Sequence, residues 1–296
     1  MKLWLFFLKG ISWALGRLPM AWQMALGDIL GWIWFDVLRF RRGVIHANLD
    51  IAFPELSKAE KNQIARRSCL NLGRTLIEFL LLPALRAQDF KEYFVIEGSE
   101  YFWRAHRQGK GVLLLSMHLG SADFALNALA ASGFPIQLIT KTFSNRWLND
   151  LWFAIRGKFG VRFIDDRNST FDILRGLHSG DGVIFVLDQF TGPPIGIEVQ
   201  FFGKRAGTAQ GLAVFALKTK APVLPVYSFR RADNKLVIEF GEEIPLRIGD
   251  SKRESICFNT QVYNDKIEQI VRRYPEFWMW IHRRWKENWY KNDDHQ

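Results

Sequence analysis

The sequence predicts an α/β fold with a mostly parallel central sheet flanked by helices, preceded by an N-terminal membrane-associated helix. Short apolar runs alternate with helical patterns of about ten to fifteen residues, which is typical of a parallel sheet covered by helices. Glycine or proline ends most of these patterns. The first forty residues are rich in tryptophan, which favours membrane interfaces.

Composition narrows the class of protein. The chain has 296 residues, 48% of them hydrophobic, enough for one large domain or one domain with an appendage. A net charge of +10 is typical of a protein that binds nucleic acid, anionic lipid or an acidic protein. We expect no nucleic-acid partner, because no zinc-finger spacing, RNP signature or basic zipper helix is found. The 12 Trp residues favour an anionic membrane instead. Cys69 and Cys257 indicate neither a disulfide framework nor a metal site.

Residues 1–42 form a distinct segment, which we expect to anchor the chain in a membrane, with a globular domain over 43–296. Asp28 and Asp36 interrupt its apolar run, so the pattern fits an interfacial helix or an oblique span. The arginines at its end mark the cytoplasmic side: Arg39, Arg41 and Arg42. The alternative is an amphipathic helix packed on the domain.

The elements of the domain follow in order. Ser57-Lys-Ala-Glu60 is a capping box that opens a helix to about Leu82, and Pro83 ends it. Strands are predicted over 94–97, 111–117, 136–140, 161–164, 182–187, 223–229 and 236–240, the last two as a hairpin. Further helices are predicted over 101–107, 121–132, 145–159, 170–178, 207–218 and 259–273.

The stretch His118-Leu-Gly-Ser-Ala-Asp123 carries the strongest chemical signal. His118 follows a buried strand, and Asp123 lies five residues later at a helix start, a spacing that lets its carboxylate reach the imidazole. Such a pair deprotonates a hydroxyl. Gly120 permits a tight turn or a close approach of backbone to substrate. A structural role for the histidine fits the pattern equally well.

A second group of polar residues follows another strand end. Asp188 and Gln189 come after the strand over 182–187, so Asp188 and His118 could line one cleft. Thr208 is a candidate N-cap, and Lys204 and Arg205 beside it could hold an anion, although an ordinary solvated link fits as well.

One more stretch has a distinctive composition, and several catalytic motifs are absent. The aromatic and basic stretch 274–286 fits cation–ring stacking, a membrane-surface segment or a packed C-terminal helix. No G-x-S-x-G elbow, P-loop or H-E-x-x-H motif is present, which argues against a serine hydrolase.

Six short motifs in order resemble those of the bacterial lipid A biosynthesis (late lauroyl or myristoyl) acyltransferases, within the lysophospholipid acyltransferase-like superfamily. They cover roughly residues 40 to 287: Asn48-Leu with Phe53-Pro-Glu-Leu-Ser57; His118-x-Gly120 with Asp123; Arg156 before Phe159-Gly160; Asp188-Gln189; Phe201-Phe-Gly203 with Thr208; and Trp280-x-His282-Arg-Arg-Trp-Lys286. The chain departs from the family at one position, because Asp123 gives an HX4D motif where lipid A enzymes usually have glutamate.

The resemblance implies an acyltransferase domain that moves a fatty acyl chain to a hydroxyl of lipid A or its precursor. The donor is an acyl carrier protein thioester, or acyl-CoA, and no cofactor or metal is expected. His118 is then the general base, Asp123 orients it, and transfer is direct. The implied substrate-binding residues are Gly120, Arg156, Asp188, Gln189, Lys204 and Thr208. The implied location is the cytoplasmic face of the bacterial inner membrane.

Two alternatives remain open at this point. The first is acyl or aminoacyl transfer to another acceptor, such as a phospholipid, glycosyl-lipid or aminolipid, because of the aspartate in the motif. The second is a non-catalytic lipid-binding protein of the same fold.

Overall fold

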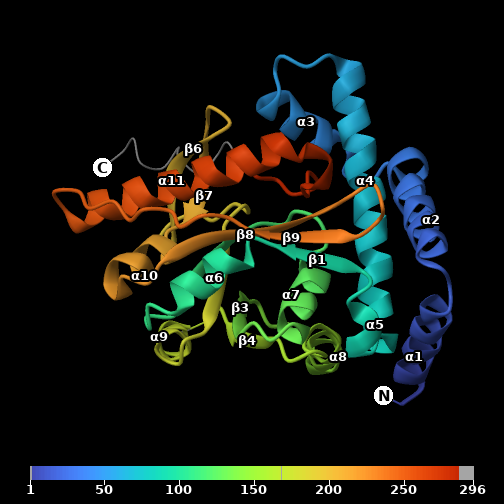
Figure 1. Ribbon diagram of the computed structural model, residues 1–296. Coiled ribbons are helices and arrows are strands. Elements are labelled where there is room, and N and C mark those ends of the chain that lie inside the picture. Colours follow the sequence, from blue (N-terminus) through green and yellow to red (C-terminus); the bar gives the residue numbers. More distant parts are fainter. Residues whose placement is uncertain (1, 168, 287–296) are drawn as a thin grey trace.

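The computed structural model describes residues 2–167 and 169–286, with backbone alone for residues 2–7 (Figure 1). It confirms an α/β fold with a mostly parallel central sheet. Seven strands lie in the order β1-β9-β8-β2-β5-β3-β4, and β6 and β7 form a separate antiparallel hairpin. The strands are β1 Phe94–Glu97, β2 Val112–Ser116, β3 Ile136–Thr140, β4 Arg162–Asp165, β5 Gly182–Val186, β6 Gly196–Phe201, β7 Lys204–Ala209, β8 Val223–Arg230 and β9 Leu236–Phe240.

Helices cover both faces of the sheet and continue beyond its edge (Figure 1). The α-helices are α1 Lys2–Gly16, α2 Met20–Trp32, α3 Arg42–Ala52, α4 Lys58–Leu81, α5 Ala87–Phe90, α6 Ser99–His106, α7 Ala122–Ala131, α8 Arg146–Arg156, α9 Thr170–His178, α10 Gly211–Thr219 and α11 Lys252–Arg273. A π-helical turn η1 spans Ile33–Leu38, and short 3₁₀ turns η2 and η3 span Leu82–Ala84 and Pro275–Phe277. The predicted capping box is present, since the Ser57 side chain accepts from the Glu60 N–H and Glu60 accepts from the Ser57 N–H.

The two strands β2 and β5 are almost entirely apolar because both of their faces are covered. In β2, Leu113 and Leu115 belong to the core on one side of the sheet, which includes residues of α3, α10 and α11. Val112 and Leu114 belong to the core on the other side, with residues of α4, α6 and α7. The side chains of a strand alternate between faces, so one apolar run supplies both cores.

The largest error of the sequence prediction lies between residues 196 and 211. A helix was predicted from Gly207, but the chain forms the hairpin of β6 and β7, and α10 begins at Gly211. The hairpin turns through Phe202 and Gly203, both with positive φ. Its strand β7, Lys-Arg-Ala-Gly-Thr-Ala, contains few residues of high strand propensity, which is why the pattern did not reveal it. The final helix also begins seven residues earlier than the predicted Asn259, at Lys252.

The N-terminal helices pack on α4 at one side of the molecule (Figure 1). Gly27 and Gly31 of α2 lie against Gly73 of α4, and a Cβ atom at any of them would collide with the backbone of the other helix. Both acids of this segment pair with arginines of α4: Asp28 with Arg74, and Asp36 with Arg66. Their carboxylates are therefore neutralised by the protein body. Among the described residues, no helix is long and apolar enough to span a membrane.

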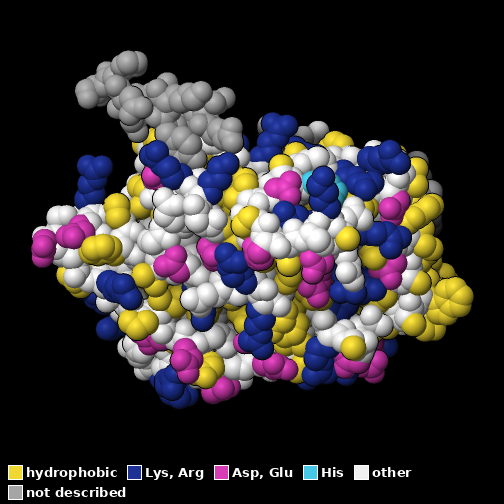
Figure 2. Space-filling view, turned by 90° about the horizontal axis from the view of Figure 1, so that it is seen from above, with side chains coloured by type: hydrophobic (Ala, Val, Ile, Leu, Met, Phe, Trp, Pro, Cys, Tyr) yellow, Lys and Arg dark blue, Asp and Glu magenta, His cyan; other side chains and the backbone are white. Residues whose placement is uncertain are grey.

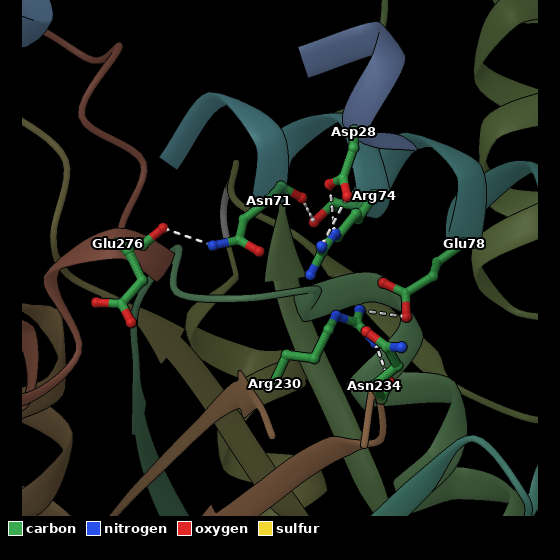
Figure 3. A network of polar contacts seen from close by, with 8 residues as sticks. Asp28, Asn71, Arg74, Glu78, Arg230, Asn234 and Glu276 are labelled. Carbon is green, nitrogen blue, oxygen red and sulfur yellow. Dashed lines mark hydrogen bonds and ion pairs between the residues drawn. The ribbon is translucent and has the colours of Figure 1, made fainter. Parts of the chain in front are cut away.

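A polar network connects α4 to neighbouring elements on several sides (Figure 3). Arg74 donates two hydrogen bonds to Asp28 of α2, at 2.6 and 2.8 Å. Glu78 lies one turn further along α4 and accepts from Arg230 at the end of β8, at 2.5 Å. Both side chains of the Glu78–Arg230 pair are buried. The helix that carries the N-terminal segment is thus fixed to the central sheet by a buried ion pair.

The C-terminal strap, residues 277–286 at the end of the described chain, contains no α-helix. It runs as an irregular strap whose large side chains point into the core, with Trp278, Trp280 and Arg284 almost fully buried. Cation–ring stacking is present as predicted, since Arg284 lies over the Phe201 ring and Lys286 over the Phe190 ring. Tryptophans that looked interfacial in the sequence are core residues here.

Candidate active site

The site lies at the carboxyl edge of the sheet, where β2 and β5 end side by side. Ser116 of β2 pairs in parallel register with Val186 of β5. His118 and Asp188 each lie two residues beyond these partners, so equal offsets bring them together. The two polar residues touch as expected, but only His118 lines a cavity at this edge, because Asp188 is buried behind it in contact with the ring.

Asp188 holds His118 by two hydrogen bonds. His118 Nδ1 lies 2.8 Å from Asp188 Oδ1, and the His118 backbone N–H donates to Oδ2 at 2.9 Å. An ionised carboxylate only accepts, so when the ring is neutral Nδ1 carries the proton and Nε2 keeps its lone pair. The Gln189 amide nitrogen lies 3.3 Å from Nε2. Asp188 is 2% exposed, whereas the His118 side chain is 35% exposed.

The structure differs from the sequence prediction at Asp123. This residue does not hydrogen-bond His118; it accepts from Arg156 Nε at 2.6 Å. Asp123 lies in the first turn of α7, and Arg156 is the last residue of the neighbouring helix α8. The Arg156 guanidinium also donates to the hydroxyl of Thr140, at the end of β3, at 3.2 Å. The expected orienting contact was wrong because the imidazole faces the neighbouring strand end rather than its own helix. Asp123 acts on His118 through its charge alone.

The electrostatics favour a charged pair. Burial on its own would lower the pKa of His118, but the negative charge and hydrogen bond of Asp188 outweigh it, and the pKa is raised. Asp123 raises the same pKa and Arg156 lowers it. For Asp188, burial would raise the pKa, but the charge of His118 and the hydrogen bonds to the carboxylate hold it below the ordinary value. Asp188 therefore stays ionised and gives His118 the character of a base.

An apolar cavity of about 430 Å³ opens beside His118. Its polar mouth includes His118, Asp123, Thr140, Lys141 and Arg156. Its deeper wall is aliphatic and comes from α7 and four strands: Leu126, Leu129, Leu138, Ile184, Val226 and Ile238. Ile184 pairs with Leu114, four residues before His118 in β2, so the cavity runs about 13 Å along the sheet at the usual rise per residue.

The other predicted site residues have different positions. Gly120 has a φ of +67°, and its close approach is to Ser228 of β8, where a Cβ atom would collide with the backbone. Thr208 is not an N-cap. It is fully buried in β7, donates to Asn264 and accepts from Arg284. Lys204 lines a separate basic groove together with Arg283 and Lys286, and neither Lys204 nor Thr208 lines the cavity beside His118.

One residue of the site had no signal in the sequence. Trp278, in the C-terminal strap, donates its indole N–H to Asp188 Oδ2 at 2.8 Å. It lies 160 residues after His118, in the aromatic and basic stretch 274–286, whose pattern did not point to His118 or Asp188. Only the folded chain brings it to the site.

Comparison with known proteins identifies the family of the chain. Residues 1–287 match the family described as bacterial lipid A biosynthesis acyltransferase. The chain is 24% identical over 288 residues to the lipid A biosynthesis palmitoleoyltransferase of Escherichia coli (strain K12), covering 96% of this chain and 92% of the relative. It is 24% identical over 294 residues to the lauroyltransferase of the same organism, with the same coverage. A phosphatidylinositol mannoside acyltransferase of Mycolicibacterium smegmatis is 21% identical over 227 residues, 76% of this chain and 73% of the relative. The chain is therefore an acyltransferase that belongs to the bacterial lipid A biosynthesis acyltransferase family.

Proposed function

We propose that this enzyme transfers a fatty acyl chain from an acyl carrier protein thioester, or from acyl-CoA, to a hydroxyl of lipid A or its precursor. The observation that carries the proposal is the His118–Asp188 pair at the mouth of a deep aliphatic cavity. The cavity suits a fatty chain, because each buried CH₂ contributes about 0.8 kcal/mol. The pair suits proton removal from the acceptor hydroxyl.

The proposed reaction is a direct displacement. His118 Nε2 takes the proton of the acceptor hydroxyl while its oxygen attacks the thioester carbonyl. The carbon–sulfur bond then breaks, and the thiolate leaves with the proton from His118. Among the described residues, no serine or cysteine hydrogen-bonds the His118 ring in a way that would supply a nucleophile for an acyl-enzyme. Asp188 keeps the useful tautomer and stabilises the imidazolium.

Arg156 and Asp123 form the second part of the proposed site. The Arg156 guanidinium is almost fully buried and engaged with Asp123, so its first role is to order the mouth of the cavity. Asn127 supports this arrangement, because its amide donates to the backbone oxygens of Asp123 and Arg156. We propose that an acceptor headgroup binds against this pair and beside Gln189.

We further propose that the N-terminal segment binds the cytoplasmic face of the bacterial inner membrane. Figure 2 shows hydrophobic side chains along the edge of the molecule where α1 and α2 lie. Between α1 and α3 the large exposed apolar residues are Ile11, Trp13, Leu18, Trp22, Ile29, Trp32, Val37, Leu38 and Phe40. Arg17, Arg39 and Arg41 accompany them, a combination that suits an anionic lipid surface. The net charge of +10 would also attract an acidic carrier protein.

The decisive experiment is acyl transfer by the full-length protein in anionic lipid vesicles. Radiolabelled acyl carrier protein thioester and acyl-CoA are compared as donors, and a lipid A precursor is compared with phosphatidylinositol mannoside as acceptor. His118→Ala is expected to abolish transfer, while His178→Ala, at the exposed end of α9, is the matched control. Full activity of His118→Ala would refute the general-base role. Transfer to the mannoside alone would favour the other acceptor, in line with the aspartate at position 123.

Membrane binding is tested separately by flotation with anionic vesicles. Replacing Trp22 and Trp32 with serine should weaken binding, because both side chains are exposed on α2. The control replaces Phe171 and Ile248, which are at least as exposed as the two tryptophans but lie outside the N-terminal segment. Equal loss of binding in both variants would contradict a role for this surface.

A further inference from the structure

The C-terminal strap is hydrogen-bonded to the backbone around His118. The Gly120 N–H donates to the Phe277 oxygen at 2.9 Å, and the Met279 N–H donates to the His118 oxygen at 3.1 Å. Leu119 and Trp278 form an antiparallel bridge between them. The segment that carries the proposed base is therefore held by residues about 160 positions later in the sequence.

Trp278, in the same strap, also hydrogen-bonds the Asp188 carboxylate. Asp188 Oδ2 accepts two hydrogen bonds, one from the Trp278 indole N–H and one from the His118 backbone N–H. These two donors fix the rotation of the carboxylate, which leaves Oδ1 for His118 Nδ1. The Asp188 side chain has no freedom to turn away without losing a buried charge-assisted hydrogen bond.

The indole itself is held rigidly. Trp278 is 2% exposed, and its ring lies perpendicular to that of Trp280, with centroids 4.5 Å apart. The Phe201 ring packs against it at 5.9 Å. A donor fixed by packing on several sides is able to hold an acceptor in one orientation.

We propose that Trp278 is a positioning residue for acyl transfer: its indole N–H fixes the Asp188 carboxylate so that Asp188 presents one oxygen to His118 Nδ1. The proposal rests on the role of His118 as general base. Trp278 does not itself line the cavity, so it acts only through Asp188.

The indole N–H also favours the ionised form of Asp188. The other charged or titratable groups that act on the pair are Asp123 and Arg156 at the cavity mouth and His282 in the strap. Losing the indole donor leaves the carboxylate more basic. His118 should then bind its proton more tightly, so the acidic limb of the pH–rate profile should move to higher pH.

The chain offers a matched control. Trp280 is as deeply buried as Trp278, but its indole N–H donates to the Pro275 oxygen at 2.7 Å and not to Asp188. Trp278→Phe and Trp280→Phe each remove one indole N–H from the same strap. A third variant places benzothienylalanine at position 278, which keeps the shape of the indole and removes only its N–H donor.

The experiment measures kcat and KM against pH for each protein, normalised to the folded fraction. For both variants at 278 we expect kcat to fall about tenfold, the loss of one hydrogen bond to a charged group, with the acidic limb shifted upward and KM for the acyl donor little changed. Trp280→Phe should keep the wild-type pH profile.

Two different results would refute the role of Trp278 and the role of His118 separately. Wild-type kcat and an unshifted limb in the benzothienylalanine protein would refute the role of Trp278 while leaving the base intact. Full activity of His118→Ala would instead remove the proposed function on which this inference rests.

Discussion

Replacing Asp188 with asparagine tests the arrangement of the site most directly. Asp188 Oδ2 accepts two N–H donors and Oδ1 faces one, His118 Nδ1. Asparagine has one acceptor oxygen, and that oxygen is needed at the position of the two donors. Its NH₂ group must then point at His118 Nδ1.

This geometry forces the wrong tautomer of His118. An NH₂ group facing Nδ1 requires Nδ1 to accept, so the ring proton moves to Nε2. With a proton on Nε2, the ring cannot take the proton of an acceptor hydroxyl. The same substitution in a serine protease triad lowers kcat about 10⁴-fold, so we expect a loss on the order of 10³–10⁴ here.

The assay is kcat in vesicles at saturating acyl donor, with Asp123→Asn measured in parallel. Asp123 makes no hydrogen bond to His118, so Asp123→Asn should retain far more activity. Because the charge of Asp123 raises the pKa of His118, its removal should move the acidic limb to lower pH. If Asp188→Asn kept activity within tenfold while Asp123→Asn lost a thousandfold, the assignment of Asp188 as the partner of His118 would be refuted.

Three further predictions follow from the same structure. His118 must be neutral to act as a base, and its pKa is raised above the ordinary value of 6.5. The activity of the wild type should therefore rise with pH, with the midpoint of the rise above 6.5; a midpoint below 6.5 would contradict the pairing of His118 with Asp188. Ile184→Phe fills the deep wall of the cavity and should shift donor preference toward shorter acyl chains, measured by competition between thioesters of different length; an unchanged preference would place the chain elsewhere. Arg230→Ala leaves Glu78 as an unpaired buried charge and should cost about 3–5 kcal/mol in urea unfolding, whereas Arg231→Ala, on an exposed pair, should leave the midpoint nearly unchanged.

The sequence determined most of the central sheet and the location of the site. Apolar runs such as Gly182–Val186 were sufficient because a strand covered on both faces has little room for polar side chains. The capping box at Ser57 was equally local, since its donors and acceptors lie three residues apart. Polar residues after two such strands marked the edge where His118 and Asp188 meet.

Only the tertiary structure decided which carboxylate holds His118. Asp123 is five residues away in sequence, but helix α7 directs it toward Arg156. Asp188 is seventy residues away, and the parallel register of β2 and β5 places it against the ring. Sequence spacing reports local geometry, whereas a hydrogen bond between strand ends depends on which strands are neighbours. For the same reason the sequence did not predict the contact of Trp278 with Asp188. This contact forms only because the C-terminal strap folds back across the sheet edge.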